Sequence, residues 1–101
     1  MLKLEEEAKK FMQDNLAITE VMTADFYEAR ANNTAIFPKE KALEYLALGL
    51  TSEAGEVAGK VKKIIRDGKG NKEAIAYEIG DVLWYCAVLA SELGVSLNTI
   101  M

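Results

Sequence analysis

The sequence contains no histidine, and this absence removes several kinds of catalytic site. Without histidine, a serine or cysteine nucleophile has no imidazole base beside it, and the most common ligand of catalytic zinc is missing. Any acid–base chemistry must therefore come from Asp, Glu, Lys or Tyr side chains, or from a water molecule bound to a metal ion.

Cysteine and proline each occur only once. Cys86 cannot form a disulfide within the chain, which fits a reducing cytoplasm, and its apolar neighbours indicate a buried thiol. A single proline also suits long helices. No apolar run approaches the length of a membrane span, and the charged segment from Met1 to Lys10 is unlike a signal peptide. We therefore expect a soluble cytoplasmic protein without membrane contact.

Positive charge is not in excess, because the formal net charge is −4 at pH 7. Without a basic face to neutralise phosphates, non-specific binding to nucleic acid is not expected. A nucleotide remains compatible with this charge, since its phosphates can be held through a metal ion. The length of 101 residues suffices for one domain with a modest core, so we treat 1–101 as a single domain.

The spacing of apolar residues predicts helices and gives no strand pattern. Apolar side chains recur every three to four residues from Leu4 to about Ala31, from Pro38 to Arg66 and from Lys72 to Leu93. Asn and Thr at 32–34 favour the end of the first helix, and Ser96 is placed to cap a short fourth one. We predict an all-α antiparallel helical bundle of three main helices plus a short C-terminal helix.

Two features of the predicted helices indicate further contacts. Gly49, Gly55 and Gly59 are costly inside a helix, which indicates close approach by a neighbouring helix or by a ligand. Trp84 and Val88 lie outside the main apolar stripe of the third helix, which predicts a second buried surface. The simplest such surface is an interface between copies of the chain, so we expect a homodimer or homotetramer.

Two pairs of carboxylates lie three residues apart within predicted helices, Glu53-Ala-Gly-Glu56 and Glu78-Ile-Gly-Asp81. This spacing places each pair on one helix face. On spacing alone the simpler interpretation is a solvated face, with Glu56 and Lys60 as an ordinary ion pair. The repetition of the pattern, with glycine in the same slot, favours four carboxylates around one small volume. Such a cluster needs a compensating cation, and Mg²⁺, or Mn²⁺ in its place, prefers carboxylate oxygens.

Basic residues follow the first carboxylate pair. Lys60 and Lys63 lie on the same flank of the predicted second helix as Glu53 and Glu56, and Arg66 follows one turn later. Lys60, Lys63 and Arg66 are therefore candidates for holding the outer phosphate oxygens of a substrate. A metal ion in the site would lower the pKa of a bound water, and a carboxylate not fully engaged by the metal would accept the proton of that water.

Four segments together resemble a known family. They are Leu48-Gly-Leu-Thr-Ser-Glu-Ala-Gly-Glu-Val-Ala-Gly-Lys-Val-Lys-Lys63, Arg66-Asp-Gly68, Glu78-Ile-Gly-Asp-Val-Leu-Trp-Tyr85 and Glu92-Leu-Gly-Val-Ser-Leu97. Over Leu43 to Ile100 the sequence closely resembles the MazG-type nucleotide pyrophosphohydrolases, which belong to the all-α NTP pyrophosphatase superfamily.

This resemblance implies a reaction and a set of site residues. Family members cleave a nucleoside triphosphate between its α- and β-phosphates, releasing a monophosphate and pyrophosphate. They use Mg²⁺, assemble as dimers or tetramers, and in many cases clear unwanted nucleotides, a house-cleaning role. The metal ligands of the family match Glu53, Glu56, Glu78 and Asp81, of which Glu53 and Glu56 are the expected catalytic carboxylates. Its phosphate-binding basic residues match Lys60, Lys62, Lys63 and Arg66.

The family pattern continues past the position of Ile100 with an Asn and a Lys-Leu-x-x-Arg segment that this sequence does not include. Any phosphate or base contact made by that segment is expected to be missing, unless another protomer or another part of the chain replaces it. The alternative to an enzyme is a non-catalytic helical assembly module with a structural or vestigial metal site. Tyr45, Tyr85 and Phe37 are candidates for stacking on a nucleobase, although core packing is the simpler expectation for each.

Overall fold

In a computed structural model of the chain, residues 22–101 are described, and these residues form helices without strands. The elements in order are α2 (Ala24–Asn33), the 3₁₀ helix η1 (Lys39–Lys41), α3 (Ala42–Asp67), α4 (Lys72–Glu92) and α5 (Leu97–Ile100). The predicted all-α class, the two long helices and the short C-terminal helix are confirmed for this part of the chain. The predicted first helix between Leu4 and residue 21 lies outside the described residues.

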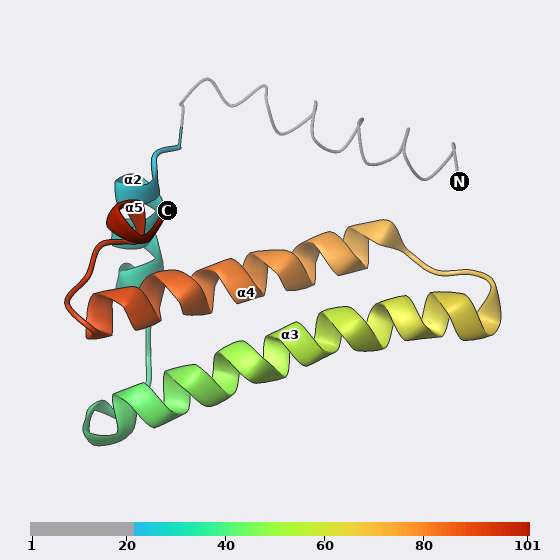
Figure 1. Cartoon of the computed structure of the whole chain (residues 1–101), viewed down its shortest axis with the longest axis horizontal. Helices are drawn as coiled ribbons and strands as arrows, with labels where there is room; N and C mark the ends of the chain where they lie inside the picture. The colour runs from blue at the N-terminus through green and yellow to red at the C-terminus, as the bar shows by residue number, and fades with distance from the viewer. Residues whose placement is uncertain (1–21) are drawn as a thin grey trace.

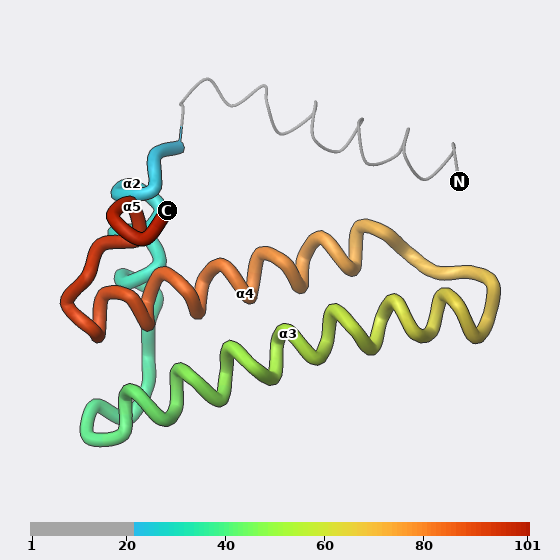
Figure 2. Tube along the Cα trace, viewed as in Figure 1, coloured from blue at the N-terminus to red at the C-terminus, as the bar shows by residue number. Residues whose placement is uncertain are grey.

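Helices α3 and α4 form an antiparallel hairpin and lie side by side along their length (Figures 1 and 2). Gly68 ends α3 in the left-handed region, with φ 71°, and its N–H donates to the Ile64 carbonyl at 2.8 Å. Asn71 then caps α4, because its side chain accepts hydrogen bonds from the backbone N–H groups of Glu73 and Ala74. The turn chemistry of the sequence therefore brings the two carboxylate-bearing helices together.

Helix α2 runs across the end of α4, with α5 beside it (Figure 1). The hydroxyl of Thr23 accepts a hydrogen bond from the Phe26 N–H at 3.1 Å, so α2 begins at Ala24. The predicted continuous helix through Met22 is therefore wrong at Met22 and Thr23, because a threonine that caps a helix lies in extended backbone. The predicted end of this helix near 32–34 is confirmed, since α2 ends at Asn33.

The core lies where α2, α3 and α4 meet. Its buried residues are Ala31 from α2, Leu46 from α3, and Ala87 and Val88 from α4. Trp84 packs against this cluster, and its Nε1–H donates to Thr34 Oγ1 at 2.9 Å. The prediction that Trp84 and Val88 face outward to another copy of the chain is therefore wrong. Helix α4 carries apolar residues on more than one face, and the second face is covered by α2 of the same chain.

A hydrogen-bonded clasp joins α2, α4 and the start of α5. The Glu28 carboxylate accepts from the Ser91 hydroxyl at 2.7 Å through Oε1 and from the Leu97 N–H at 3.3 Å through Oε2. Asn32 Nδ2 donates to the same Ser91 Oγ at 2.8 Å. Both oxygens of this half-buried carboxylate are thus satisfied, and α5 is tied to the other helices.

Gly49 on α3 explains how closely α4 approaches. A Cβ atom at Gly49 would lie 2.2 Å from Tyr85 Cε1, so the bare backbone lets the Tyr85 ring lie against α3. The close approach predicted at this glycine is therefore that of the neighbouring helix. Cβ atoms at Gly55 and Gly59 would meet nothing within 4 Å in the part of the chain that the structure describes.

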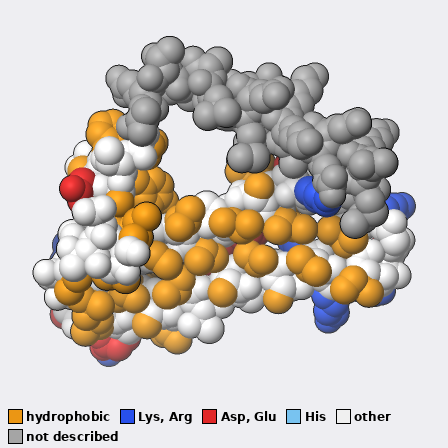
Figure 3. All heavy atoms as spheres, turned by 45° about the horizontal axis from the view of Figure 1, so that its top comes forward, with side chains coloured by type: hydrophobic (Ala, Val, Ile, Leu, Met, Phe, Trp, Pro, Cys, Tyr) orange, Lys and Arg blue, Asp and Glu red, His pale blue; other side chains and the backbone are white. Residues whose placement is uncertain are grey.

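Helix α4 is rich in apolar residues along its length. Among the described helices it is long and apolar enough to cross a membrane by length and composition alone, which corrects the expectation that no apolar run reaches that length. The same helix packs on both α2 and α3, as a core helix of a globular protein does. Apolar side chains nevertheless stay exposed along both long helices, including Ile65, Ile79 and Leu83 (Figure 3).

Candidate functional site

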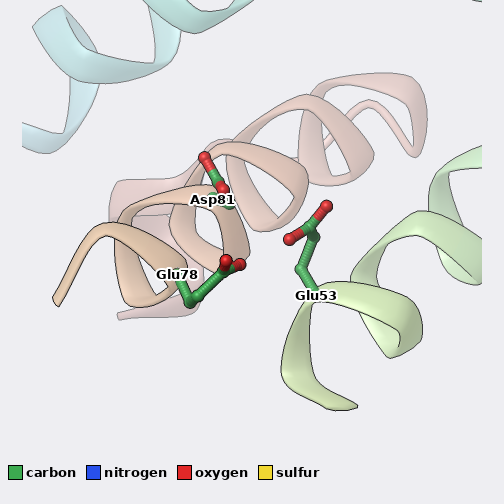
Figure 4. A group of neighbouring side chains, drawn as sticks. All are labelled: Glu53, Glu78 and Asp81. Carbon is green, nitrogen blue, oxygen red and sulfur yellow. The ribbon is translucent and has the colours of Figure 1, made fainter. Parts of the chain in front are cut away.

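Three carboxylates converge in the groove between α3 and α4. Glu53 extends from α3 toward Glu78 and Asp81 on α4 (Figure 4). One carboxylate oxygen from each of the three residues lies within 4.8 Å of the others. Glu78 and Asp81 are one helical turn apart, and the antiparallel packing places Glu53 opposite them. The structure therefore brings together three of the four predicted metal ligands, which we call the acidic trio.

The trio is electrostatically unfavourable on its own. A side-chain hydrogen bond to Glu78, with partial loss of water and the negative charges of Asp81, Glu78 and Glu56, raises the pKa of Glu53. A hydrogen bond between two carboxyl groups needs a proton on one of them. When both are ionised, that bond is lost and the like charges repel each other.

Glu78 has the least satisfied carboxylate of the trio. Its Oε2 atom is buried and has no hydrogen-bond partner among the described residues. Its Oε1 atom lies 3.7 Å from Lys60 Nζ, and the two side chains are 17% and 31% exposed. One ammonium group facing three carboxylates leaves a net charge of −2 when all four groups are ionised. An additional positive charge at this position would therefore be electrostatically favourable.

These donors fit a hard divalent cation. Carboxylate oxygens are the preferred ligands of Mg²⁺ and Mn²⁺, and the described part of the site offers neither histidine nor thiolate. The orphaned Glu78 Oε2 gives a specific reason to expect a ligand, because a buried carboxylate oxygen without a partner is costly. The acidic trio is therefore a candidate site for such an ion.

An open pocket with a volume of about 350 Å³ borders the trio on the α2 side. It is lined by Glu53, Asp81, Thr34, Trp84 and Tyr85. Trp84 and Tyr85 meet edge to face, with ring centroids 4.9 Å apart. The pocket therefore combines a carboxylate edge with an aromatic wall.

Two phenols lie close to the acidic groups. Burial, followed by the charges of Asp81 and Cys86, raises the pKa of Tyr27 on α2. Burial also raises the pKa of Tyr85, and Tyr45, Glu53 and Asp81 add to this effect. Both phenols thus keep their protons at neutral pH.

A smaller pocket of about 130 Å³ lies farther along the hairpin, toward the loop between α3 and α4. Lys60 and Lys63 line it together with Ile64, Gly70, Asn71 and Ala74. Because Lys60 also pairs with Glu78, this basic pocket adjoins the acidic trio. The two lysines predicted as substrate-binding residues therefore share one pocket.

The remaining predicted site residues lie apart from the trio. Glu56 is exposed and is not one of the three converging carboxylates, although its charge acts on Glu53. Arg66 donates to its neighbour Asp67 through Nε at 2.7 Å and through Nη2 at 2.9 Å. This pair holds the Arg66 guanidinium at the exposed end of α3. Lys62 is exposed, and sequence periodicity places it on the other flank of the helix.

Sequence reasoning missed Thr34 and Trp84 as residues of the site. Trp84 follows Asp81 by three residues, a spacing that places both on one face of α4, so this helix register was the available signal. Thr34 reaches the pocket through a hydrogen bond to Trp84, which is 50 positions away. No local pattern could have indicated that contact.

Comparisons with known proteins identify the family of the chain. Residues 41–101, which contain all three members of the trio, match the family model described as the MazG nucleotide pyrophosphohydrolase domain. The gene 37 protein of Mycobacterium phage L5 is 43% identical over 90 residues, a match that covers 78% of this chain and 79% of that protein. No solved structure matches the chain.

Proposed function

We propose a specific hydrolytic activity from one premise, namely that the chain belongs to the MazG nucleotide pyrophosphohydrolase family. The protein hydrolyses a nucleoside triphosphate, or its deoxy form, to the monophosphate and pyrophosphate. The observation that carries this proposal is the convergence of Glu53, Glu78 and Asp81, between an aromatic pocket and a basic pocket. The proposed setting is the cytoplasm, with removal of unwanted nucleotides as the role.

Glu53, Glu78 and Asp81 would hold Mg²⁺, with Mn²⁺ as a substitute. When bound there, the ion would supply Lewis acidity toward phosphate oxygens and water. The three carboxylates would hold that positive charge between α3 and α4. The support for Glu78 among these ligands is its buried Oε2 atom, which has no hydrogen-bond partner among the described residues.

The two pockets suggest how the substrate is oriented along the α3–α4 hairpin. The nucleoside lies in the pocket of Thr34, Trp84 and Tyr85, and the terminal phosphates lie toward Lys60 and Lys63. Ammonium groups bind phosphate oxygens as point charges and offset the charge of the leaving pyrophosphate. Arg66 uses two of its five N–H donors on Asp67, so it can join them with the donors that remain.

The chemical step is an attack by water on the α-phosphorus. The new bond joins the water oxygen to the α-phosphorus, and the bond from that phosphorus to the α,β-bridging oxygen breaks. Glu56 is the acid of the predicted set that stays exposed and outside the trio, so its carboxylate is free to accept the proton of the water. Glu53 is the other candidate base, because its proton affinity is already raised.

We also propose that the protein works as a homodimer or homotetramer. The support is the apolar surface that is exposed on both long helices in the described part of the chain, including Val61, Ile65, Ile79 and Leu83. The mass of the protein in solution tests this part separately from the activity.

The experiment that tests the activity is product identification with labelled water. The protein is incubated with Mg²⁺ and each common NTP or dNTP in H₂¹⁸O. The products are separated, and their masses are measured by mass spectrometry. The proposal expects monophosphate carrying one ¹⁸O atom, unlabelled pyrophosphate, and loss of both products in Glu53→Gln. Diphosphate plus phosphate, or the label in pyrophosphate, would refute it. No product with any nucleotide would instead favour a non-catalytic assembly module.

A further inference from the structure

Lys60 on α3 lies between the acidic trio and the basic pocket. Its Nζ atom is 3.7 Å from Glu78 Oε1, and the same side chain lines the pocket that contains Lys63. Among the described residues, this ion pair is the one that joins a basic side chain to the trio. A single ammonium group is therefore shared by two neighbouring sites, one suited to a cation and one suited to an anion.

The ion pair between Lys60 and Glu78 is loose. Its separation of 3.7 Å exceeds the length of about 2.8 Å that is typical of a charge-assisted hydrogen bond. The Lys60 side chain is also partly exposed, and ion pairs of this kind contribute little to stability. The second oxygen of Glu78, Oε2, has no partner among the described residues. Lys60 thus offsets part of the negative charge of the trio and leaves the rest uncompensated.

A divalent ion in the trio would weaken the hold on Lys60. With all three carboxylates ionised, the charge that the ammonium group faces would fall from −3 to −1. An ion held by Glu78 would also compete with Lys60 for the Oε1 atom. The lysine ammonium group lies at the end of a flexible four-carbon stem, so it can turn away from Glu78 while the stem stays in the pocket that it already lines.

We propose that Lys60 is an internal counter-ion of the acidic trio, which pairs with Glu78 in the metal-free protein and is released to the basic pocket when a divalent ion binds. The inference rests on the proposed function and adds a form of regulation to the same site. Lys60 joins Lys63 in holding phosphate oxygens once the metal site is filled. The basic pocket is therefore fully charged for an anion only after the cation has bound.

Calorimetric titration of Mn²⁺ into the full-length, metal-free protein measures the competition between Lys60 and the ion without any substrate. Lys60→Met removes the charge and keeps an apolar stem. We expect it to bind Mn²⁺ about tenfold more tightly, because it lacks the repulsion between an ammonium group and a divalent ion about 5 Å apart in water. Lys60→Arg keeps the charge and should bind Mn²⁺ as the unsubstituted chain does.

Lys41→Met is the matched control for this titration. Lys41 is exposed and lies just before α3, twelve residues before Glu53, so its charge is largely screened from the trio. The substitution changes the net charge of the protein by the same amount as Lys60→Met. We expect it to leave the Mn²⁺ affinity unchanged. Far-UV circular dichroism checks that each variant is folded.

Release of Lys60 is measured in the unsubstituted chain by acetylation of its lysines, with the labelled positions identified by mass spectrometry. Saturating Mg²⁺ should make Lys60 react about threefold faster, a factor that matches the loss of a weak, partly exposed ion pair. Lys41 should react at the same rate with and without Mg²⁺. Pyrophosphate added together with Mg²⁺ should slow Lys60 again, because its ammonium group then contacts phosphate oxygens.

The outcomes separate this inference from the proposed function. Tighter Mn²⁺ binding by Lys60→Met and faster labelling of Lys60 in Mg²⁺, without hydrolysis of any nucleotide, would support the counter-ion and remove the enzyme. Hydrolysis by the unsubstituted chain, with equal or weaker Mn²⁺ binding by Lys60→Met, would overturn the counter-ion and leave the enzyme in place. Labelling of Lys60 that Mg²⁺ leaves unchanged, or no Mn²⁺ binding by the unsubstituted chain, would also overturn the inference.

Discussion

Two glutamates in contrasting environments lie along helix α4. Glu28 reaches α4 from α2, and Glu78 belongs to α4 itself. Near its C-terminal end, Glu28 of α2 accepts hydrogen bonds from the Ser91 hydroxyl and the Leu97 N–H, so both of its oxygens have partners. In its middle, Glu78 has a buried oxygen without a partner and faces two further carboxylates. The clasp is complete within the chain, whereas the acidic trio is incomplete.

This difference indicates that Glu28 stabilises the fold, whereas Glu78 belongs to a functional site. A half-buried carboxylate with two donors stabilises the fold, and removing it should cost stability. A carboxylate that gathers with like charges costs stability until a cation arrives, and such arrangements are typical of functional sites. The comparison therefore predicts opposite responses to substitution in the two regions.

The largest expected effect is on catalysis, at the trio. Asp81→Asn keeps the size of the side chain but removes one charge from the proposed metal site. We expect turnover to fall by about 10³-fold, on the order of 4 kcal/mol of transition-state stabilisation. Initial rates of pyrophosphate release measure this change, with Glu92→Gln as the control on the same helix. Equal rates in Asp81→Asn and the unsubstituted protein would remove Asp81 from the site.

The second largest expected effect is on stability, in the core where α2, α3 and α4 meet. Leu46 is 0% exposed, so Leu46→Ala should lower the free energy of unfolding by about 3 kcal/mol through lost burial and a cavity. Urea denaturation measures the loss. Leu48→Ala, at a residue that is 71% exposed on the same helix, should cost far less. Similar losses in the two variants would show that the core is placed wrongly.

A smaller loss is expected at the clasp itself. Glu28→Ala leaves the Ser91 hydroxyl and the Leu97 N–H without their acceptor, which should cost about 2 kcal/mol of unfolding free energy. Urea denaturation of the metal-free protein measures this. A double variant with Ser91→Ala should lose less than the sum of the two single losses, because the two residues share one bond. Full additivity would argue against that bond.

The opposite sign is expected at Glu78. In the metal-free protein, Glu78→Gln removes a charge from the trio and should raise the unfolding free energy by about 1 kcal/mol, the size of one like-charge repulsion at this separation in water. The same denaturation curves used for Glu28→Ala give the comparison directly. A loss of stability in metal-free Glu78→Gln would show that Lys60 already satisfies this carboxylate.

The smallest effect is a pH dependence. Because the pKa of Glu53 is raised in the folded protein, the folded state binds more protons than the unfolded state between the ordinary value of 4.5 and the raised value. The stability of the metal-free protein should therefore fall as the pH rises through that interval. Thermal midpoints measured upward from pH 4.5 test this, and Glu53→Gln should flatten the slope. A rise in stability over the same interval would contradict the shared proton.

Much of the hairpin could be predicted from sequence, because its signals are local. Periodic apolar residues, the left-handed Gly68 and the Asn71 cap define α3, α4 and the turn, and the carboxylate spacing then places Glu78 and Asp81 on one face. The orientation of Trp84 could not be predicted in this way. Helix α4 is apolar on several sides, and only the position of α2 decides which side is covered.

Some contacts within the site could not be predicted from sequence, because they too depend on how the helices pack. Glu53 and Glu56 look equivalent in sequence, yet only Glu53 reaches the trio, because the inward direction of α3 depends on its packing against α4. The solvated-face interpretation of the sequence paired Lys60 with Glu56, whereas in the structure Lys60 pairs with Glu78 across the groove. Contacts between helices depend on their relative rotation, which a periodic pattern constrains only loosely.

The most direct test of the acidic trio as a metal site is calorimetric titration of Mn²⁺ into the metal-free protein. The unsubstituted chain is compared with Glu78→Gln in the trio and with Glu28→Gln in the clasp. We expect saturable binding in the unsubstituted chain and in Glu28→Gln, and a loss of affinity of about 100-fold or more in Glu78→Gln. Equal binding in all three proteins, or no binding in the unsubstituted chain, would contradict the assignment of the trio as a metal site.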